Sequence, residues 1–147
     1  MSWKIKRRLR EQLAREQGYV SFPAGTRRTF ALVYPNAYFV GMSNLGLHII
    51  YELLNRRGDT ACERFFLPSE EEQKEYEHTG TPLLSMENQL PLHQFPLIGF
   101  AVSFEMDYFH VLRILQLGKV RLLAAERTER DPIVLAGGPC STFNPEP

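Results

Sequence analysis

The chain has 147 residues, 44% of them hydrophobic, and its 17 basic residues balance 17 acidic ones. This length suits one globular domain with a single core. The balanced charge argues against a broad electropositive surface of the kind that binds nucleic acid or anionic membranes. No stretch approaches the roughly 18 apolar residues of a membrane span. Its two cysteines, far apart in the sequence, favour free thiols, so we expect a cytoplasmic protein.

Residues 1–18 are predicted to form a basic amphipathic helix that covers Trp3 to Gln17. Ile5, Leu9 and Leu13 recur at helical spacing, and lysines and arginines occupy much of the remainder. We expect the apolar stripe to dock on the rest of the domain or on a partner domain. Contact of its basic face with nucleic acid or membrane is the alternative.

Strands and helices alternate over residues 19–147. Buried strands are predicted at Phe30–Tyr34, Ala61–Phe66, Leu97–Val102 and Ile133–Ala136. Helices are predicted from a cap at Ser43 or Asn44 to Gly58, at Ser69–Tyr76 and at Tyr108–Leu117. The proline-rich segment Thr81–Gln94 is expected to be an extended connection with one edge strand at most. This order predicts an α/β fold, a flavodoxin- or Rossmann-like doubly wound parallel sheet with helices on both faces.

A doubly wound sheet of the flavodoxin type has about five strands. The fourth predicted strand lies close to Pro147, so we expect a domain that is truncated after this strand. A fragment of a longer protein is the favoured interpretation. Self-association through the open sheet edge is the other, because an unpaired edge strand invites pairing.

Ligands of open parallel sheets bind where strands end and helices begin. Three predicted strand ends meet this description, in segments 34–45, 102–105 and 136–139. The glycines there would let a ligand approach the backbone, and the polar side chains would bind it, although turn geometry and helix capping explain the same residues. The candidate contact residues are Asn36, Tyr38, Gly41, Ser43, Ser103, Glu105, Gly137 and Gly138.

Four ordered motifs carry a family resemblance: YPNAYFVGMSNLGLHIIYELLN, CERFFLP, GFAVSFEMDYFHVLRIL and ERTERDPIVLAGGPCSTFNPEP. Together they resemble the N-terminal cobalamin-binding-type domain of radical S-adenosylmethionine (radical SAM) proteins. The resemblance implies a Rossmann-like domain that precedes a barrel, whose three cysteines bind a [4Fe-4S] cluster that cleaves S-adenosylmethionine. This chain has only Cys62 and Cys140, too few thiolates for such a cluster. Cluster and S-adenosylmethionine would therefore belong to a downstream barrel, in the same chain or a separate one.

The cobalamin signature of that family resembles Asp-x-His-x-x-Gly after the first strand, then Ser-x-Leu, then Gly-Gly. Asn36, Tyr38 and Gly41 fall in the first frame, Ser103 heads the second, and Gly137-Gly138 fits the third. Tyr38 stands in place of the imidazole, and a neutral phenol is a poor cobalt ligand. Asn36 cannot supply the carboxylate that orients such an imidazole. Cobalamin is therefore expected to bind without a histidine from this loop.

Two functions follow from the sequence. The first is a cofactor-binding or substrate-presenting domain of a radical SAM iron-sulfur enzyme, not catalytic by itself. The alternative is a degenerate structural or protein-interaction module that has lost cobalamin and uses its basic helix as a contact surface. A nucleotide-binding flavodoxin-like protein is disfavoured because no phosphate-binding motif is present. For the first function, Gly138→Val is expected to abolish ligand binding and to leave the helices intact.

Overall fold

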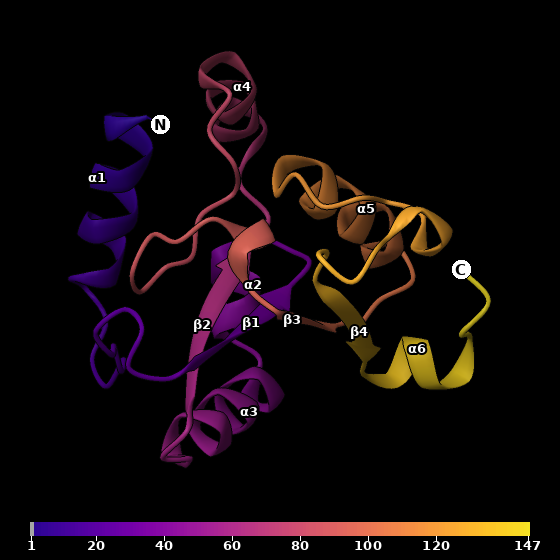
Figure 1. Ribbon diagram of the computed structural model, residues 1–147, viewed down its shortest axis with the longest axis horizontal. Helices are drawn as coiled ribbons and strands as arrows, with labels where there is room; N and C mark the ends of the chain where they lie inside the picture. Colours follow the sequence, from indigo (N-terminus) through magenta and orange to yellow (C-terminus); the bar gives the residue numbers. More distant parts are fainter. Residues whose placement is uncertain (1) are drawn as a thin grey trace.

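Figure 1 shows the computed structural model, which describes residues 2–147. Its centre is a four-stranded sheet in the order β2-β1-β3-β4, with every neighbouring pair parallel. The predicted α/β fold with a parallel sheet is therefore confirmed. The strands are β1 (Arg28–Tyr34), β2 (Thr60–Phe66), β3 (Leu97–Ala101) and β4 (Ile133–Gly137). Each lies within one or two residues of its predicted bounds.

Of the five helices that follow β1, three match the sequence prediction and two short ones were not predicted. The predicted helices are α3 (Leu45–Arg56), α4 (Glu70–Thr79) and α5 (Asp107–Leu117). The additional ones are α2 (Tyr38–Met42) and α6 (Pro139–Phe143), each in a strand-end segment that was expected to be a loop. Single 3-10 turns occur at Leu92–Gln94 and Ala124–Glu126. Helices of five residues lack the length from which a sequence period is recognised.

The longer helices begin where side chains satisfy their free backbone N–H groups. Asn44, one of the two predicted caps, accepts a hydrogen bond from Leu47 N at 3.0 Å and starts α3. Ser69 starts α4 with a capping box: Glu72 N donates to its hydroxyl, and Ser69 N donates to the Glu72 carboxylate at 2.6 Å. Such caps are worth about 1 kcal/mol each.

The N-terminal helix α1 (Trp3–Leu13) is four residues shorter than predicted. It nevertheless docks on the domain as expected, with Ile5 fully buried in the core. After Leu13 the chain turns, and the carboxylate of Glu16 reaches the buried guanidinium of Arg64 at 2.7 Å. The residues just after α1 thus form a turn that carries this ion pair, where the sequence predicted a longer helix.

The basic face of α1 meets the acidic first turns of α4. Arg8 pairs with Glu72 at 2.8 Å and Lys4 pairs with Glu75 at 3.6 Å. The nitrogen of Ser2 also donates to the Thr81 hydroxyl at 2.7 Å, in a buried hydrogen bond. Part of the positive charge of α1 is therefore neutralised within the domain.

Helices cover both faces of the sheet. On one face, α3 packs against β1 and β2 and buries Leu47 and Tyr51 with Leu32 and Cys62. The opposite face carries α1, α4, α5 and the connection 81–95. This layering is that of a doubly wound sheet. Among residues 2–147, no helix combines the length and the apolar character that crossing a bilayer requires.

The two edges of the sheet differ. Along β2, Met86 N donates to Arg64 O at 2.9 Å, and Arg64 N donates to the Glu87 carboxylate at 2.8 Å. The connection that was predicted as extended thus covers this edge with one backbone and one side-chain hydrogen bond. It forms no strand, only an isolated bridge between Leu84 and Pro91. Within residues 2–147 no strand pairs with the outer edge of β4.

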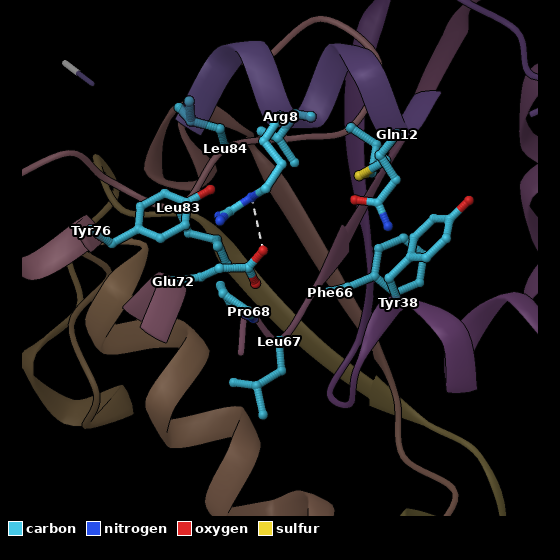
Figure 2. A pocket seen from close by; sticks show the side chains of 12 residues that line it. Arg8, Gln12, Tyr38, Phe66, Leu67, Pro68, Glu72, Tyr76, Leu83 and Leu84 are labelled. Atoms are coloured by element: carbon cyan, nitrogen blue, oxygen red, sulfur yellow. Dashed lines mark ion pairs between the residues drawn. The ribbon is translucent and has the colours of Figure 1, made fainter. Parts of the chain in front are cut away.

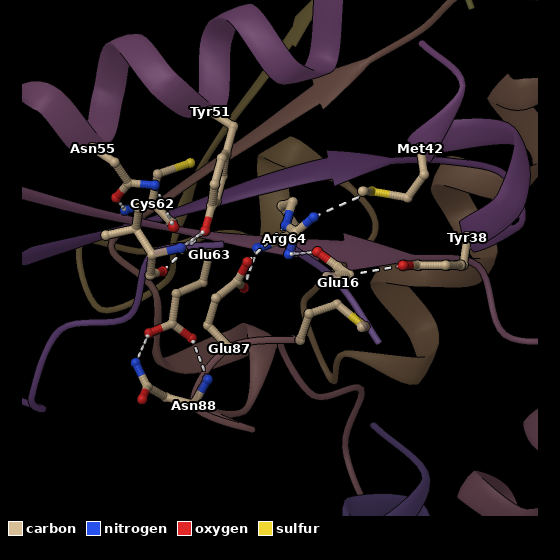
Figure 3. A network of polar contacts seen from close by, with 12 residues as sticks. Glu16, Tyr38, Met42, Tyr51, Asn55, Cys62, Glu63, Arg64, Glu87 and Asn88 are labelled. Carbon is tan, nitrogen blue, oxygen red and sulfur yellow. Dashed lines mark hydrogen bonds and ion pairs between the residues drawn. The ribbon is translucent and has the colours of Figure 1, made fainter. Parts of the chain in front are cut away.

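A buried ionic network joins these parts (Figure 3). Arg64 Nε donates to Glu87 at 2.7 Å, and Arg64 Nη2 donates to Glu16 at the same distance. The side chains of Arg64 and Glu87 are only 3% and 0% exposed. The guanidinium also lies 4.7 Å from the ring centre of Tyr51. Burial raises the pKa of the Glu87 carboxyl, and the adjacent Arg64 opposes that rise.

The substitution Arg64→Met is expected to lower the free energy of unfolding by about 3–5 kcal/mol, because Glu87 would stay buried without its cation. Urea denaturation followed by circular dichroism measures this change. Arg57→Met is the matched control: it removes an arginine whose pair with Asp59 is exposed, so it should change stability little. Comparable losses in both variants would contradict a dominant role for the buried pair.

Candidate functional site

An apolar groove of about 480 Å³ opens beside α3, on the face of the sheet that this helix covers in part. Its walls come from β1, β3, β4 and the first turns of α3, and include Leu32, Ile50 and Leu135. The chain leaves β1 toward α3 on one face and leaves β3 toward α5 on the other. The groove therefore lies on the α3 face of β1, β3 and β4. It reaches the carboxyl ends of β3 and β4, next to the topological switch point between β1 and β3 where open α/β sheets bind their ligands. Its volume is within the range of small-molecule sites.

Three of the predicted site residues line this groove: Ser103, Gly137 and Gly138. Ser103 follows β3 and is half-buried. A backbone hydrogen bond joins the segment after β3 to the end of β4: Val102 N donates to Gly137 O at 2.7 Å. The two strand ends predicted to share a rim are thus in direct contact.

Gly137 and Gly138 differ in how much room their surroundings leave for a side chain. Gly138 has a φ of +110°, and a Cβ atom there would lie 2.4 Å from the carbonyl oxygen of Val102. The crossing of two backbone segments therefore requires glycine at 138, whether or not a ligand is bound. Gly137 has no atom within 4 Å of its virtual Cβ. It lies two residues after Leu135 in β4, so an added side chain would project into the groove.

This geometry changes the test expected for Gly138→Val. A valine there would strain the backbone and strike Val102, so lost binding would not distinguish a ligand contact from misfolding. A larger side chain at Gly137 would fill the groove without straining the backbone, so Gly137 is the better position for this test.

Tyr38 does not line the groove. It is the first residue of α2, its hydroxyl donates to Glu16 at 2.8 Å, and its ring packs edge-on against Phe66 at 5.2 Å. Burial, followed by the hydrogen bond to Glu16, raises the pKa of Tyr38 to about 12. The phenol therefore stays protonated near neutral pH and anchors α2 to the network of Arg64.

Asn36 ties the loop after β1 to the loop after β3. Its Nδ2 donates to the fully buried carboxylate of Asp107 at 3.1 Å, and its Oδ1 accepts from Ala37 N at 2.8 Å. His110 Nδ1 lies 2.8 Å from the carbonyl oxygen of Pro35 and 3.3 Å from Asp107. Because a carbonyl only accepts, Nδ1 carries the proton. Asp107, which is buried, and His110, which is partly exposed, thus connect α5 to the loop after β1 in addition to contacting each other within the helix.

The remaining three predicted residues also lie outside the lining of the groove. Gly41 is buried, and a Cβ atom there would lie 2.4 Å from the ring of Phe66. The Ser43 hydroxyl donates to Phe39 O at 2.9 Å within the turn that ends α2. Glu105 is exposed in the loop before α5. Close packing thus surrounds Gly41, and a local hydrogen bond occupies the hydroxyl of Ser43.

Sequence reasoning missed the apolar walls of the groove, such as Phe30, Leu32, Ile50 and Leu135. An apolar residue in a strand or helix is read as core, and nothing in its local pattern marks the face that stays open. Asn44, which also lines the groove, lies in the predicted ligand segment 34–45 but was singled out only as a helix cap, and Gly46 was not singled out. Their place beside a strand end was the available signal.

A second cavity lies beneath α1 (Figure 2). It has a volume of about 50 Å³, and the ion pair of Arg8 and Glu72 spans part of its wall. This space suits a few water molecules and is too small for an organic cofactor.

The two cysteines, Cys62 and Cys140, are both free thiols, and burial raises the pKa of Cys62. Over the described chain, no three histidine, cysteine or acidic side chains come together to hold a metal ion.

Comparison with known proteins agrees with the motifs. Residues 46–147 match the family described as radical SAM proteins, N-terminal. The chain is also similar to the uncharacterized protein MJ0966 of Methanocaldococcus jannaschii, with 24% identity over 117 residues. That alignment covers 80% of this chain and 20% of the archaeal protein, so the chain spans about a fifth of that relative. No solved structure matches the sequence significantly.

The glycine pair yields a test of the fold around the groove. Gly138→Ala is expected to lower the free energy of unfolding by about 1–3 kcal/mol, because alanine is strained at positive φ and meets Val102. Gly137→Ala should leave stability nearly unchanged or raise it slightly, since its backbone is ordinary and its surroundings are open. Denaturant titration measures both. Equal losses of stability in the two variants would contradict the close contact between Gly138 and the backbone of Val102.

Proposed function

The chain belongs to the N-terminal family of radical SAM proteins, and on that basis we propose that it is a corrinoid-binding domain of such a protein. In this proposal the groove at the switch point holds the nucleotide tail of cobalamin. The observation that carries it is the groove itself: an apolar slot of about 480 Å³ beside Ser103 and the open Gly137. Cobalamin, when bound, supplies cobalt chemistry that protein side chains lack.

The residues present fit part of such a cofactor. A flat heteroaromatic tail suits an apolar slot with few polar groups. The corrin ring is larger than the groove and would lie outside it, over the loops at the carboxyl ends of the strands. Phe39 of α2, and Phe104 and Met106 of the loop before α5, are exposed there. Large exposed apolar side chains gathered at one edge support a binding surface there.

The lower face of cobalt would receive no histidine from the loop after β1. Tyr38 occupies the position of that histidine, and its hydroxyl is already bound to Glu16. Asn36 is bound to Asp107. The two departures from the cobalamin signature thus serve to hold α2 and the loop in place. We therefore expect cobalamin in its base-off form.

The other chemistry would belong to the rest of the protein. Family membership implies a [4Fe-4S] cluster and S-adenosylmethionine in a complete radical SAM protein, and both require a cluster-binding barrel, in cis or as a separate chain. In this proposal the exposed strand-end loops face that barrel and present the corrinoid or the substrate to it. The domain alone would not be catalytic.

Cobalamin titration followed by visible absorbance tests the proposal. We expect saturable binding with a base-off spectrum, in this chain or in a version extended by a fifth strand. Gly137→Val should weaken binding at least about tenfold, because the side chain fills the groove; a loss of this size is about 1.4 kcal/mol. Tyr38→Phe should leave the bound spectrum unchanged.

Gly58→Val is the matched control, since Gly58 also has an open environment and lies outside the groove. The Gly58→Val variant should bind cobalamin with the same affinity as the unmodified chain. Equal weakening in both valine variants would place the ligand elsewhere. No binding by a cooperatively folded chain, with or without the extension, would favour the degenerate interaction module instead.

A further inference from the structure

Helix α3 has more apolar surface than the sheet covers. Its inner side chains, Leu47 and Tyr51, are buried. Leu45, Ile49 and Leu53, spaced four residues apart, are 72%, 48% and 59% exposed. Residues at this spacing form a ridge of the kind that packs into the groove of another helix. The sequence pattern predicts one wide buried face here, and the structure buries only half of it.

The charges beside this ridge are already paired. Arg56 Nη2 donates to Glu52 at 2.6 Å, within the same helix. A charged partner would therefore gain little at this ridge, whereas an apolar one would remove exposed leucine and isoleucine from water. The ridge is suited to an apolar helix face.

The apolar surface continues from α3 across the groove to β4. Ile50 of α3 and Leu135 of β4 both line the groove and are partly exposed. Ile133, two residues before Leu135 and thus on the same face of β4, is exposed as well. Helix α3 itself packs on β1 and β2. We call the surface of Leu45, Ile49, Ile50, Leu53, Ile133 and Leu135 the α3–β4 face.

We infer that the α3–β4 face is covered by an amphipathic helix from the remainder of the radical SAM protein, and that this helix forms the outer wall of the groove. The inference rests on the proposed function, in which this domain works beside other parts of such a protein. The chain spans only 20% of its archaeal relative, so that relative has ample polypeptide for such a helix. A helix that packs against both Ile50 of α3 and Leu135 of β4 would cover the groove, because these two residues line it.

Thiol labelling tests the inference without any cofactor. Leu53→Cys is introduced in a Cys140→Ser background, into the 147-residue chain and into the natural full-length protein. We expect labelling to be at least about tenfold slower in the full-length protein. Leu123→Cys is the matched control, because Leu123 is 62% exposed and lies outside the α3–β4 face; its labelling rate should be similar in both proteins.

Equal rates for Leu53→Cys in both proteins would overturn the inference. Slower labelling of the 147-residue chain at higher concentration would also overturn it, because a second copy would then cover the face. Cross-linking from Leu53→photo-leucine in the full-length protein identifies the covering segment. Products at every third or fourth residue of one segment support a helix, and scattered or intermolecular products contradict it. Since no cobalamin is present, failure of the corrinoid proposal leaves these readouts unaffected.

Discussion

The guanidinium of Arg64 is buried on β2, and a buried charge destabilises a fold by several kcal/mol unless oppositely charged groups reach it. Glu16 and Glu87 come to it from segments that lie 48 and 23 residues away in the sequence. Glu16 lies just after α1, Glu87 lies in the connection 81–95 that covers the edge of β2, and Glu16 also accepts a hydrogen bond from Tyr38. One buried charged side chain thereby links three segments: the residues after α1, the connection 81–95 and α2.

The ionic network of Arg64 also supports the candidate site, through contacts with α2. Tyr38 and Met42, at the two ends of α2, contact Glu16 and Arg64 respectively. Since α3 begins three residues after Met42, a fixed α2 also fixes the first turn of α3, which forms a wall of the groove. Asn36 and Asp107 hold the neighbouring loops in the same way. The polar residues of the strand ends thus position the site, and apolar side chains and bare backbone line it.

Under the corrinoid proposal, this division of labour would explain why the cobalamin signature is altered while its frame is kept. In the frame, Tyr38 and Asn36 replace a histidine and an aspartate, and both are engaged with other residues of the domain. The glycine positions 137 and 138 remain at the groove, one for a backbone crossing and one beside open space. In the two proposals made above, the domain would hold a corrinoid by its tail, and a helix on the α3–β4 face would complete the site from outside.

The sequence by itself determined the α/β class, the four parallel strands and the starts of α3 and α4, because periodicity, prolines and capping side chains act over a few neighbouring residues. It also located Ser103, Gly137 and Gly138 at one rim, since the ends of parallel strands meet. Only the tertiary structure decided that Tyr38 points to Glu16 and that Gly41 is buried against Phe66. It alone decided that half of the apolar face of α3 stays open. Such outcomes depend on contacts between distant segments, and a local pattern holds no record of which partner a side chain meets.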